Sequence, residues 1–233
     1  MNARFLAIAR DPAIIPGVHH YCDEWCQYCP VTRRCLGFRC TEEFRRQRGR
    51  HGSDATFSSM EEALSFTRQL AALDGSPTED LDAIVANLPG RSGLQTADPL
   101  ASVAWEYAVT AAFLFTDQAM ASIGEGPRAS GPAAAEIVLW YHLRIYMKLV
   151  RALISLDRVQ DGEHRIDDAN GCAKLTLTSI ARSKTALAAL RAEDNRRGVD
   201  PLIDSLTALE RGIEARFPLA RSFVRVGLDC PAT

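Results

Sequence analysis

From residue 58 onward, the apolar positions of the chain recur three and four residues apart, which is the spacing of a helix with one buried face. The pattern predicts four long helices, over residues 99–123, 132–159, 167–190 and 201–217. Asp98 and Asp200 stand where a capping side chain would begin the first and the last of them. Heptad-like spacing of this kind is typical of antiparallel neighbours in a helical bundle.

The apolar faces of these helices identify the residues expected in the core of the bundle. The second helix is expected to bury Leu139, His142, Tyr146, Leu149, Leu153 and Leu156. The third is expected to bury Ala169, Cys172, Ala173, Thr176, Ile180, Ser183, Leu187 and Leu190. The fourth is expected to bury Leu202, Leu206, Leu209, Ile213 and Phe217, with Pro218 ending or kinking it.

Two shorter helical segments precede the bundle. Ser59 stands three residues before Glu62, which is the arrangement of a capping box, and predicts a helix to about Leu73. A short helix is expected over residues 79–88, and a loop over residues 91–97. No segment alternates between apolar and polar residues as a half-buried strand does. The predicted fold class is therefore all-α.

The first fifty residues look irregular, because prolines at positions 12, 16 and 30 limit helix formation. We therefore expect two parts: a cysteine-rich metal-binding module over residues 1–52 and a four-helix-bundle-like body over residues 53–233. The charged residues are also distributed differently between these two parts. Nine arginines oppose five acidic residues up to Gly52, whereas 18 basic residues oppose 24 acidic residues after it.

The overall composition, with 47% hydrophobic and 24% charged residues, is that of a globular protein. The sequence shows neither the apolar core of a signal peptide nor an apolar stretch of membrane-spanning length. The predicted location is therefore the cytoplasm, without membrane association. Reducing conditions there favour metal binding over disulfides for clustered cysteines.

Five cysteines lie between residues 22 and 40, and the first four have the spacing C-x3-C-x2-C-x5-C. Thiolates spaced so closely on a tight loop can hold the corners of a [4Fe–4S] cluster. The predicted ligands are Cys22, Cys26, Cys29 and Cys35, which leaves Cys40 spare. Aromatic residues at positions 21, 25 and 28 are expected to shield such a cluster from water.

Zinc is the alternative metal. Cys26 and Cys29 form a C-x2-C knuckle, and two further ligands would complete a tetrahedral site. The candidates for those two positions are Cys22, Cys35, Cys40, His19 and His20. The knuckle has no partner a dozen or so residues away, which is the usual spacing between paired knuckles.

Two resemblances concern the same residues. Cys22-x3-Cys26-x2-Cys29, with aromatic Tyr28 before the third cysteine, resembles the cluster motif of radical S-adenosylmethionine enzymes. That resemblance covers eight residues and implies a cluster with one open iron, but no βα repeat of a barrel follows it. The longer string HHYCDEWCQYCPVTRRCL is similar to a motif of small bacterial proteins of unassigned function, in which it precedes a helical region. This second resemblance implies metal binding and no particular reaction.

These patterns favour an iron–sulfur protein with a redox, electron-transfer or accessory role over an independent catalyst. A zinc-stabilised adaptor or regulator and a cluster-dependent enzyme are the two alternatives. Seven arginines between Arg33 and Arg50 form a basic run beside the cysteines. This run is expected to face either solvent or an acidic protein partner, with nucleic acid less favoured.

The predicted bundle helices also carry residue types that could form a second site. Carboxylates and a histidine on the predicted helices are the residue types of di-iron bundles, here Glu106, Asp117, Glu136, His142 and Asp168. The Glu-x-x-His step of such sites is missing, however, so His142 is expected to be a hydrogen-bonded core residue. Cys172 is expected to act as a small apolar residue, and Cys230 has no neighbouring helper in the sequence. No catalytic Ser/His/Asp or Cys/His set and no phosphate-binding loop can be assigned.

Overall fold

In the computed structural model, the described residues are 3–49, 57, 59–74, 98–123, 132–158, 164–194 and 198–229. All regular structure within these ranges is helical, which confirms the all-α class. Contacts between the Cα atoms divide the chain into two compact units. Unit 1 comprises residues 1–94 and 224–233, and unit 2 comprises residues 95–223.

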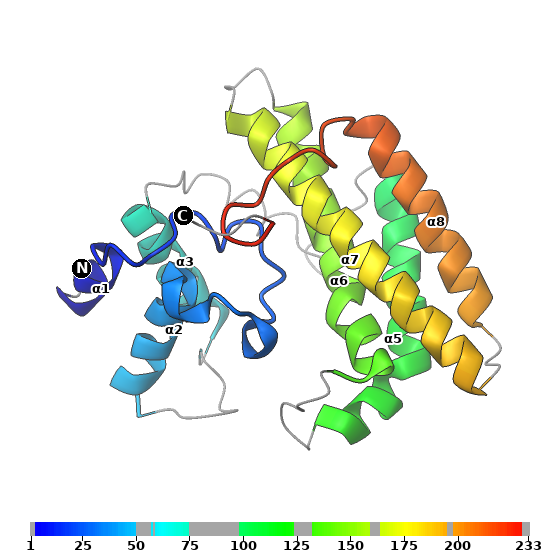
Figure 1. Cartoon of the computed structure of the whole chain (residues 1–233), viewed down its shortest axis with the longest axis horizontal. Helices are drawn as coiled ribbons and strands as arrows, with labels where there is room; N and C mark the ends of the chain where they lie inside the picture. Colours follow the sequence, from blue (N-terminus) through cyan, green and yellow to red (C-terminus); the bar gives the residue numbers. More distant parts are fainter. Residues whose placement is uncertain are drawn as a thin grey trace. The chain divides into compact units, whose positions relative to one another are not determined.

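Unit 2 is a four-helix bundle (Figure 1). Its helices are α5 (Pro99–Ile123), α6 (Ala134–Asp157), α7 (His164–Asp194) and α8 (Val199–Arg216). Each packs against the next, and α5 also packs against α8, so the four helices close a ring. Short connections between consecutive helices make neighbours antiparallel, as in up-down-up-down bundles.

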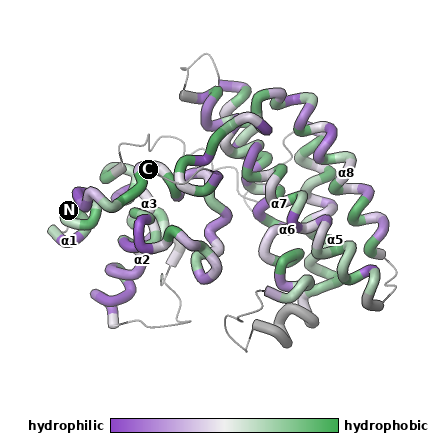
Figure 2. The backbone as a smooth tube through the Cα atoms, in the orientation of Figure 1, coloured by the Kyte–Doolittle hydropathy of each residue, from purple (hydrophilic) through white to green (hydrophobic). Residues whose placement is uncertain are grey.

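The core of the bundle follows the predicted faces of α7 and α8. Every residue expected to be buried on these two helices is buried. The prediction for α6 was wrong in part, because Leu139, His142 and Leu156 are only half-buried. The buried seam of α6 instead runs through Val138, Tyr141, Ile145, Leu149 and Ala152. Figure 2 shows apolar residues along the bundle helices, and on α6 those beside the seam, such as Leu139 and Leu156, made the seam ambiguous in the sequence.

The ends of the bundle helices agree with the sequence at one position and differ at another. Asp98 caps α5, since its Oδ1 accepts the Leu100 N–H at 2.9 Å. The predicted Asp200 cap of α8 was wrong, because Gly198 holds the N-cap position with φ +101°. A left-handed φ suits glycine, which lacks a Cβ. Asp200 lies within the first turn of α8 and pairs with Arg191 at 3.0 Å.

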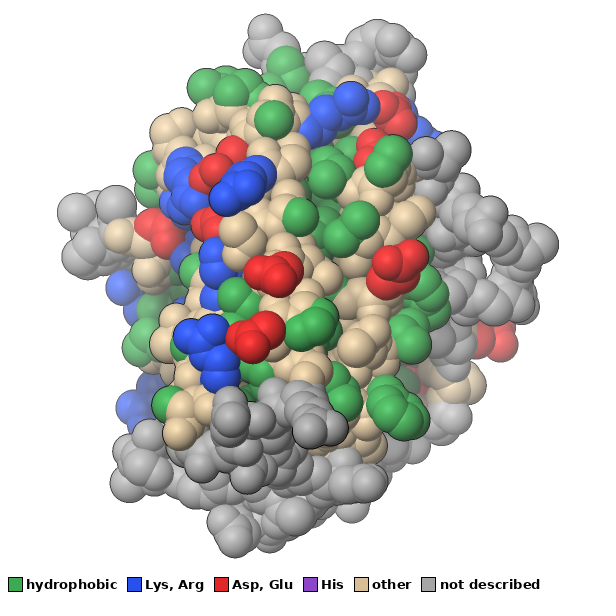
Figure 3. All heavy atoms as spheres, turned by 90° about the vertical axis from the view of Figure 1, so that its right-hand side faces the viewer, with side chains coloured by type: hydrophobic (Ala, Val, Ile, Leu, Met, Phe, Trp, Pro, Cys, Tyr) green, Lys and Arg blue, Asp and Glu red, His purple; other side chains and the backbone are tan. Residues whose placement is uncertain are grey.

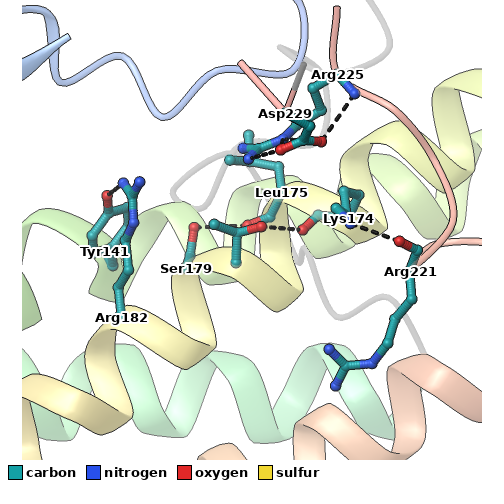
Figure 4. Close-up of polar contacts among 9 residues, drawn as sticks. Tyr141, Lys174, Leu175, Ser179, Arg182, Arg221, Arg225 and Asp229 are labelled. Carbon is teal, nitrogen blue, oxygen red and sulfur yellow. Dashed lines mark hydrogen bonds and ion pairs between the residues drawn. The ribbon is translucent and has the colours of Figure 1, made fainter. Parts of the chain in front are cut away.

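Polar contacts tie the segment after α8 to the bundle. α8 ends at Arg216, immediately before Phe217 and Pro218, as predicted. Lys174 of α7 then donates from Nζ to the carbonyl oxygen of Arg221 at 2.6 Å (Figure 4).

On the face of unit 2 in Figure 3, apolar side chains are interspersed with acidic and basic ones.

Unit 1 contains more helix than its sequence indicated. Its helices are α1 (Ala3–Ala9), α2 (Leu36–Gln47) and α3 (Met60–Asp74), with single 3-10 turns at η1 (Cys26–Tyr28) and η2 (Thr32–Arg34). The expectation that residues 1–52 are irregular was therefore wrong for α1 and α2. The prolines restrict helix between residues 12 and 30, a segment that contains loops and the single 3-10 turn η1.

An aromatic core joins α3 to the helices before it. Phe66 of α3 is buried with Phe5, Leu36 and Cys40, and its ring centroid lies 6.1 Å from that of Phe5. Ser59 begins α3 as predicted, because its Oγ accepts the Glu62 N–H at 3.1 Å. These contacts explain why α3 belongs to unit 1, so the compact unit extends past the boundary expected at residue 52.

No helix within the described parts of the chain combines the length and the apolarity needed to cross a membrane. The expected helix over residues 79–88, the expected loop over residues 91–97 and Cys230 lie outside the described residues.

Candidate metal centre

The cysteines stand on a short framework built from residues 11–20 and the start of α2. The backbone N–H of Ile15 donates to the Arg34 carbonyl at 2.9 Å, and Arg34 Nε donates to the Ala13 carbonyl at 3.1 Å. Arg39 of α2 pairs with Asp11, and this hydrogen bond lowers the pKa of the Asp11 carboxyl. These three contacts hold the segment before the cysteines against η2 and α2.

Cys26 and Cys29 flank a single 3-10 turn. The Cys29 N–H donates to the Cys26 carbonyl at 3.2 Å, which closes the turn η1. In 3-10 geometry, side chains three residues apart eclipse one another. The two thiols therefore leave the turn on the same side, as a pair of ligands to one metal must.

Cys35 is both the N-cap of α2 and a buried residue. Its Sγ accepts the Phe38 N–H at 3.5 Å, and its side chain packs with Ile15 and Val18. Burial raises the pKa of the Cys35 thiol, while the N–H groups of Phe38 and Gly37 act in the opposite direction. Helix N-termini favour negative charge, so this position suits a thiolate that a metal has deprotonated.

Cys26, Cys29 and Cys35 lie close enough to affect one another electrostatically. Burial raises the pKa of Cys26 to about 11, and the next largest causes are Cys35 and Cys29. The acidic side chains of Glu24 and Asp23 add to the effect. Buried thiols such as Cys26 and Cys35, which resist ionisation, become stable thiolates when a cation neutralises them.

Cys22 lies before this group and has a different partner. Its Sγ donates to the carbonyl oxygen of His19 at 3.4 Å. Between Cys22 and Cys26 the chain bends sharply. Glu24 has φ +58°, a left-handed conformation uncommon outside glycine, and Asp23 Oδ1 accepts the Trp25 N–H at 3.2 Å. This turn redirects the chain between the first and the second cysteine.

His19 contacts the start of α2. A Cβ added at Gly37 would lie 3.3 Å from three atoms of the His19 side chain, so this glycine permits the approach. The His19 and His20 ring centroids are 4.6 Å apart, in an edge-to-face arrangement. The two adjacent histidines are visible in the sequence, but nothing in the sequence indicates that His19 contacts Gly37.

Aromatic side chains surround part of the cysteine loop. Trp25 is buried, and its ring lies edge-on to Tyr28 with centroids 5.1 Å apart. Both residues were expected to shield a metal centre, and both lie in the turn that carries Cys26 and Cys29. Exclusion of water is one of the ways in which a protein sets a cluster's potential.

Cys40 lies in the aromatic core of unit 1. It is 1% exposed and packs with Phe5, Leu36 and Phe66. Burial raises its pKa to about 11, and Cys35 adds to the rise. The packing accounts for Cys40 as a core residue.

All five cysteines of the N-terminal cluster are thiols rather than disulfides. Across the described part of the chain, no group of three or more His, Cys, Asp or Glu side chains is arranged to hold a metal ion. Cys26, Cys29 and Cys35 therefore do not form such a group in this structure. Their thiols are nevertheless the donor type that a thiophilic metal prefers.

The basic run beside the cysteines is largely paired within unit 1. Arg45 and Arg46 of α2 pair with Glu42 and Glu43, each at 2.7 Å. Arg48 pairs with Glu62 of α3. Arg39 pairs with Asp11, as described above, whereas Arg50 lies outside the described residues. These pairs neutralise much of the run, and docking of an acidic protein partner there stays a prediction.

Among the described side chains, the carboxylates and the histidine of the bundle do not meet at a second site. Glu106 is exposed on α5, and Glu136 accepts the Ala133 N–H at 3.3 Å at the start of α6. His142 contacts the Leu139 carbonyl of its own helix, and burial lowers its pKa. The side chain of Asp117 is outside the described residues.

Asp168 of α7 is part of a polar network that sequence reasoning missed. It accepts hydrogen bonds from Arg151 Nε at 3.1 Å and from Ser155 Oγ at 2.6 Å. Cys172 lies one turn further along α7, fully buried, and burial raises its pKa to about 11. The network satisfies a partly buried carboxylate between α6 and α7, which is a structural role.

The chain matches no family model, no curated protein and no solved structure.

Proposed function

We propose that unit 1 binds a metal centre through four thiolates, Cys22, Cys26, Cys29 and Cys35, and that its leading form is a [4Fe–4S] cluster. In this proposal the protein has a redox, electron-transfer or accessory role in a reducing cytoplasm. The observation that carries the proposal is the placement of Cys26 and Cys29 at the two ends of one closed 3-10 turn and of Cys35 at the N-cap of α2. Thiols of this kind are the ligands that thiophilic metals prefer.

The surrounding residues have definite roles in this proposal. The Phe38 N–H that reaches Cys35 Sγ would remain as a hydrogen bond to the metal-bound sulfur, which raises a cluster's reduction potential. Trp25 and Tyr28 would limit the access of water to the pair of ligands on η1. A bound cluster would supply one-electron transfer. The rest of unit 1 positions the ligands and keeps Cys40 out of the site.

Zinc is the second candidate, and the position of Cys35 favours it. A thiolate that caps a helix and accepts a backbone N–H is also suited to a structural zinc site. In that form the metal would stabilise the loop between Val18 and Cys35, which contains only two single 3-10 turns. The role would then be that of an adaptor or regulator whose N-terminal unit folds with its metal.

Anaerobic purification followed by elemental and sulfide analysis distinguishes the candidates. We expect brown protein with about four iron and about four sulfide per chain, and a visible band that dithionite bleaches. Colourless protein with about one zinc and no iron would replace the cluster by the zinc form. A Cys40→Ala variant is the matched control, because it removes a thiol of the same segment and should retain the metal. Protein that keeps neither metal would refute both forms.

A further inference from the structure

We infer that residues 224–229 form a strap that closes over the buried cluster of Ile15, Val18 and Cys35, and that release of the strap exposes the Cys35 thiol while the helices of unit 1 stay folded. The strap belongs to unit 1, although the segment immediately before it belongs to the bundle. No bound metal is needed for this closure. Three features of the described residues support it.

First, the strap is a closed turn held by its own hydrogen bonds. The N–H groups of Leu228 and Asp229 donate to the Arg225 carbonyl at 3.0 Å and 2.9 Å. The Asp229 carboxylate accepts the Arg225 N–H at 3.0 Å, and it also accepts Nε at 3.1 Å and Nη2 at 2.6 Å from the same side chain (Figure 4). Because these bonds lie within the strap, the turn is preorganised for docking and does not depend on the cluster for its shape.

Second, one leucine side chain of the strap packs on the cluster. Leu228 contacts the group of Ile15, Val18 and Cys35, which are themselves buried. The contact is apolar, and Leu228 is half-buried, so it covers the cluster from the surface of unit 1. Burial of a leucine side chain favours the docked strap by about tenfold to a hundredfold over the released one.

Third, a glycine lets the strap approach the cluster closely. A Cβ at Gly227 would lie 2.9 Å from Ile15 Cδ1 and 3.4 Å from Val18 Cγ2. Gly227 also has φ +78°, a conformation that suits a residue without a Cβ. Val224 and Val226 are 53% and 57% exposed, so the strap meets the cluster through Gly227 and its neighbour Leu228.

The position of Cys35 is held by bonds that do not involve the strap. Its N–H donates to the Thr32 carbonyl at 3.2 Å, and its Sγ accepts the Phe38 N–H at the start of α2. The thiol is 7% exposed, and Leu228 is one of the side chains packed on its cluster. Release of the strap therefore uncovers the thiol and leaves the N-cap of α2 in place. Access to this sulfur is controlled by a segment far from it in the sequence.

The test measures how fast each thiol of the full-length, reduced and metal-free protein reacts with N-ethylmaleimide. Mass spectrometry of tryptic peptides reads the thiols separately, because trypsin cleaves after Arg34 and after Arg39 and so places Cys35 and Cys40 in different peptides. Hydrogen exchange of the same proteins reports whether α1, α2 and α3 stay folded.

Three single variants are compared with the wild type. Leu228→Asn replaces the apolar side chain by a polar one of similar size and adds no charge near the thiol. Asp229→Ala breaks the bonds that close the turn, at an exposed position where folding of the core is not at risk. Val224→Ala changes an exposed residue of the same strap and is the matched control.

We expect Leu228→Asn to raise the rate constant of Cys35 alkylation by about tenfold to a hundredfold over wild type. Asp229→Ala should raise it by about threefold to tenfold. Val224→Ala should leave it within about twofold of wild type. The rate constants of Cys40, in the aromatic core, and of Cys172, in the bundle, should stay at their wild-type values in every variant.

Two results would overturn the role of the strap. The first is a Cys35 rate constant that is the same in wild type, Leu228→Asn and Asp229→Ala. The second is faster alkylation of Cys35 and Cys40 together, with loss of protection in α1, α2 and α3, because Leu228 would then be an ordinary core residue of unit 1. Neither result bears on metal binding, which the elemental analysis decides separately.

Discussion

Replacing Phe66 by alanine should unfold unit 1 well before unit 2. The Phe66 ring is buried, and it lies 5.0 Å from the Phe44 ring and 5.4 Å from the Phe57 ring, centroid to centroid. Removing a buried phenylalanine side chain costs about 3–5 kcal/mol, which includes the cavity left behind. A small domain is stable by about 5–15 kcal/mol, so unit 1 would lose a large share of its stability.

The magnitude can be expressed as a melting temperature. Each 1 kcal/mol shifts the midpoint of a domain of this size by about 4–8 °C, so a loss of about 4 kcal/mol corresponds to roughly 20 °C. Hydrogen exchange read by mass spectrometry across a temperature or urea series reports the two units separately. Peptides from α1, α2 and α3 should lose protection together, at a lower midpoint than in wild type.

Two controls make this prediction decisive. Gln69→Ala changes an exposed residue of the same helix and should alter stability by no more than about 0.5 kcal/mol. Phe115→Ala removes a buried ring of α5 and should destabilise unit 2 instead. If Phe66→Ala left α1 and α2 protected, or lowered both units equally, then α3 would not be part of the core that supports the cysteine loop.

Three further outcomes follow from the residues of unit 1. Gly227→Ala places a Cβ 2.9 Å from Ile15 at a backbone φ of +78°, and should lower the unfolding free energy of unit 1 by about 1–3 kcal/mol in urea titration; an unchanged midpoint would contradict it. Arg39 lowers the pKa of Asp11, so their pairing stabilises the fold above the unfolded carboxyl's pKa of about 3.9 and is lost as pH falls through the lower folded value. In Asp11→Asn, the free energy of unfolding should therefore fall less steeply with decreasing pH below about pH 4 than in wild type. The same pH dependence in the variant and the wild type would count against a stabilising Asp11–Arg39 pair. The pKa of Cys26 is raised to about 11, so in the metal-free protein this thiol should react with iodoacetamide far more slowly at pH 8 than glutathione does. The rate constant of its alkylation should rise up to about pH 11. Equal rate constants for Cys26 and glutathione at about pH 8 would show that the thiol is not buried.

The bundle could be predicted from the sequence where one face alone is apolar. On α7 and α8 the apolar positions are separated by polar ones, and their buried residues were predicted correctly. On α6, apolar residues such as Leu139 and Leu156 flank the true seam, so a shift of one position, about 100° around the helix, still gives an apolar stripe.

In unit 1, α2 was not predicted, although its sequence has the pattern of an amphipathic helix, because the cysteines in the same segment drew the interpretation toward an irregular loop. Leu36, Cys40 and Phe44 are four residues apart and form the apolar side of α2, beside Arg–Glu pairs at i,i+3. The ligand set Cys22, Cys26, Cys29 and Cys35 stays a prediction from the cysteine spacing. The contact between His19 and Gly37 could not be predicted, because it joins residues far apart in sequence through a glycine whose only signal is a missing side chain.

X-ray absorption at the metal edge of the anaerobically purified full-length protein reads the ligands of the metal without further assumptions. We expect a first shell of about four sulfur neighbours around each metal at about 2.3 Å, with a metal–metal contact in the leading iron–sulfur form. Cys40→Ala should give the same spectrum, because Cys40 belongs to the aromatic core. A first shell dominated by oxygen or nitrogen, or a spectrum that changes with Cys40 but not with Cys35, would contradict a centre built on Cys22, Cys26, Cys29 and Cys35.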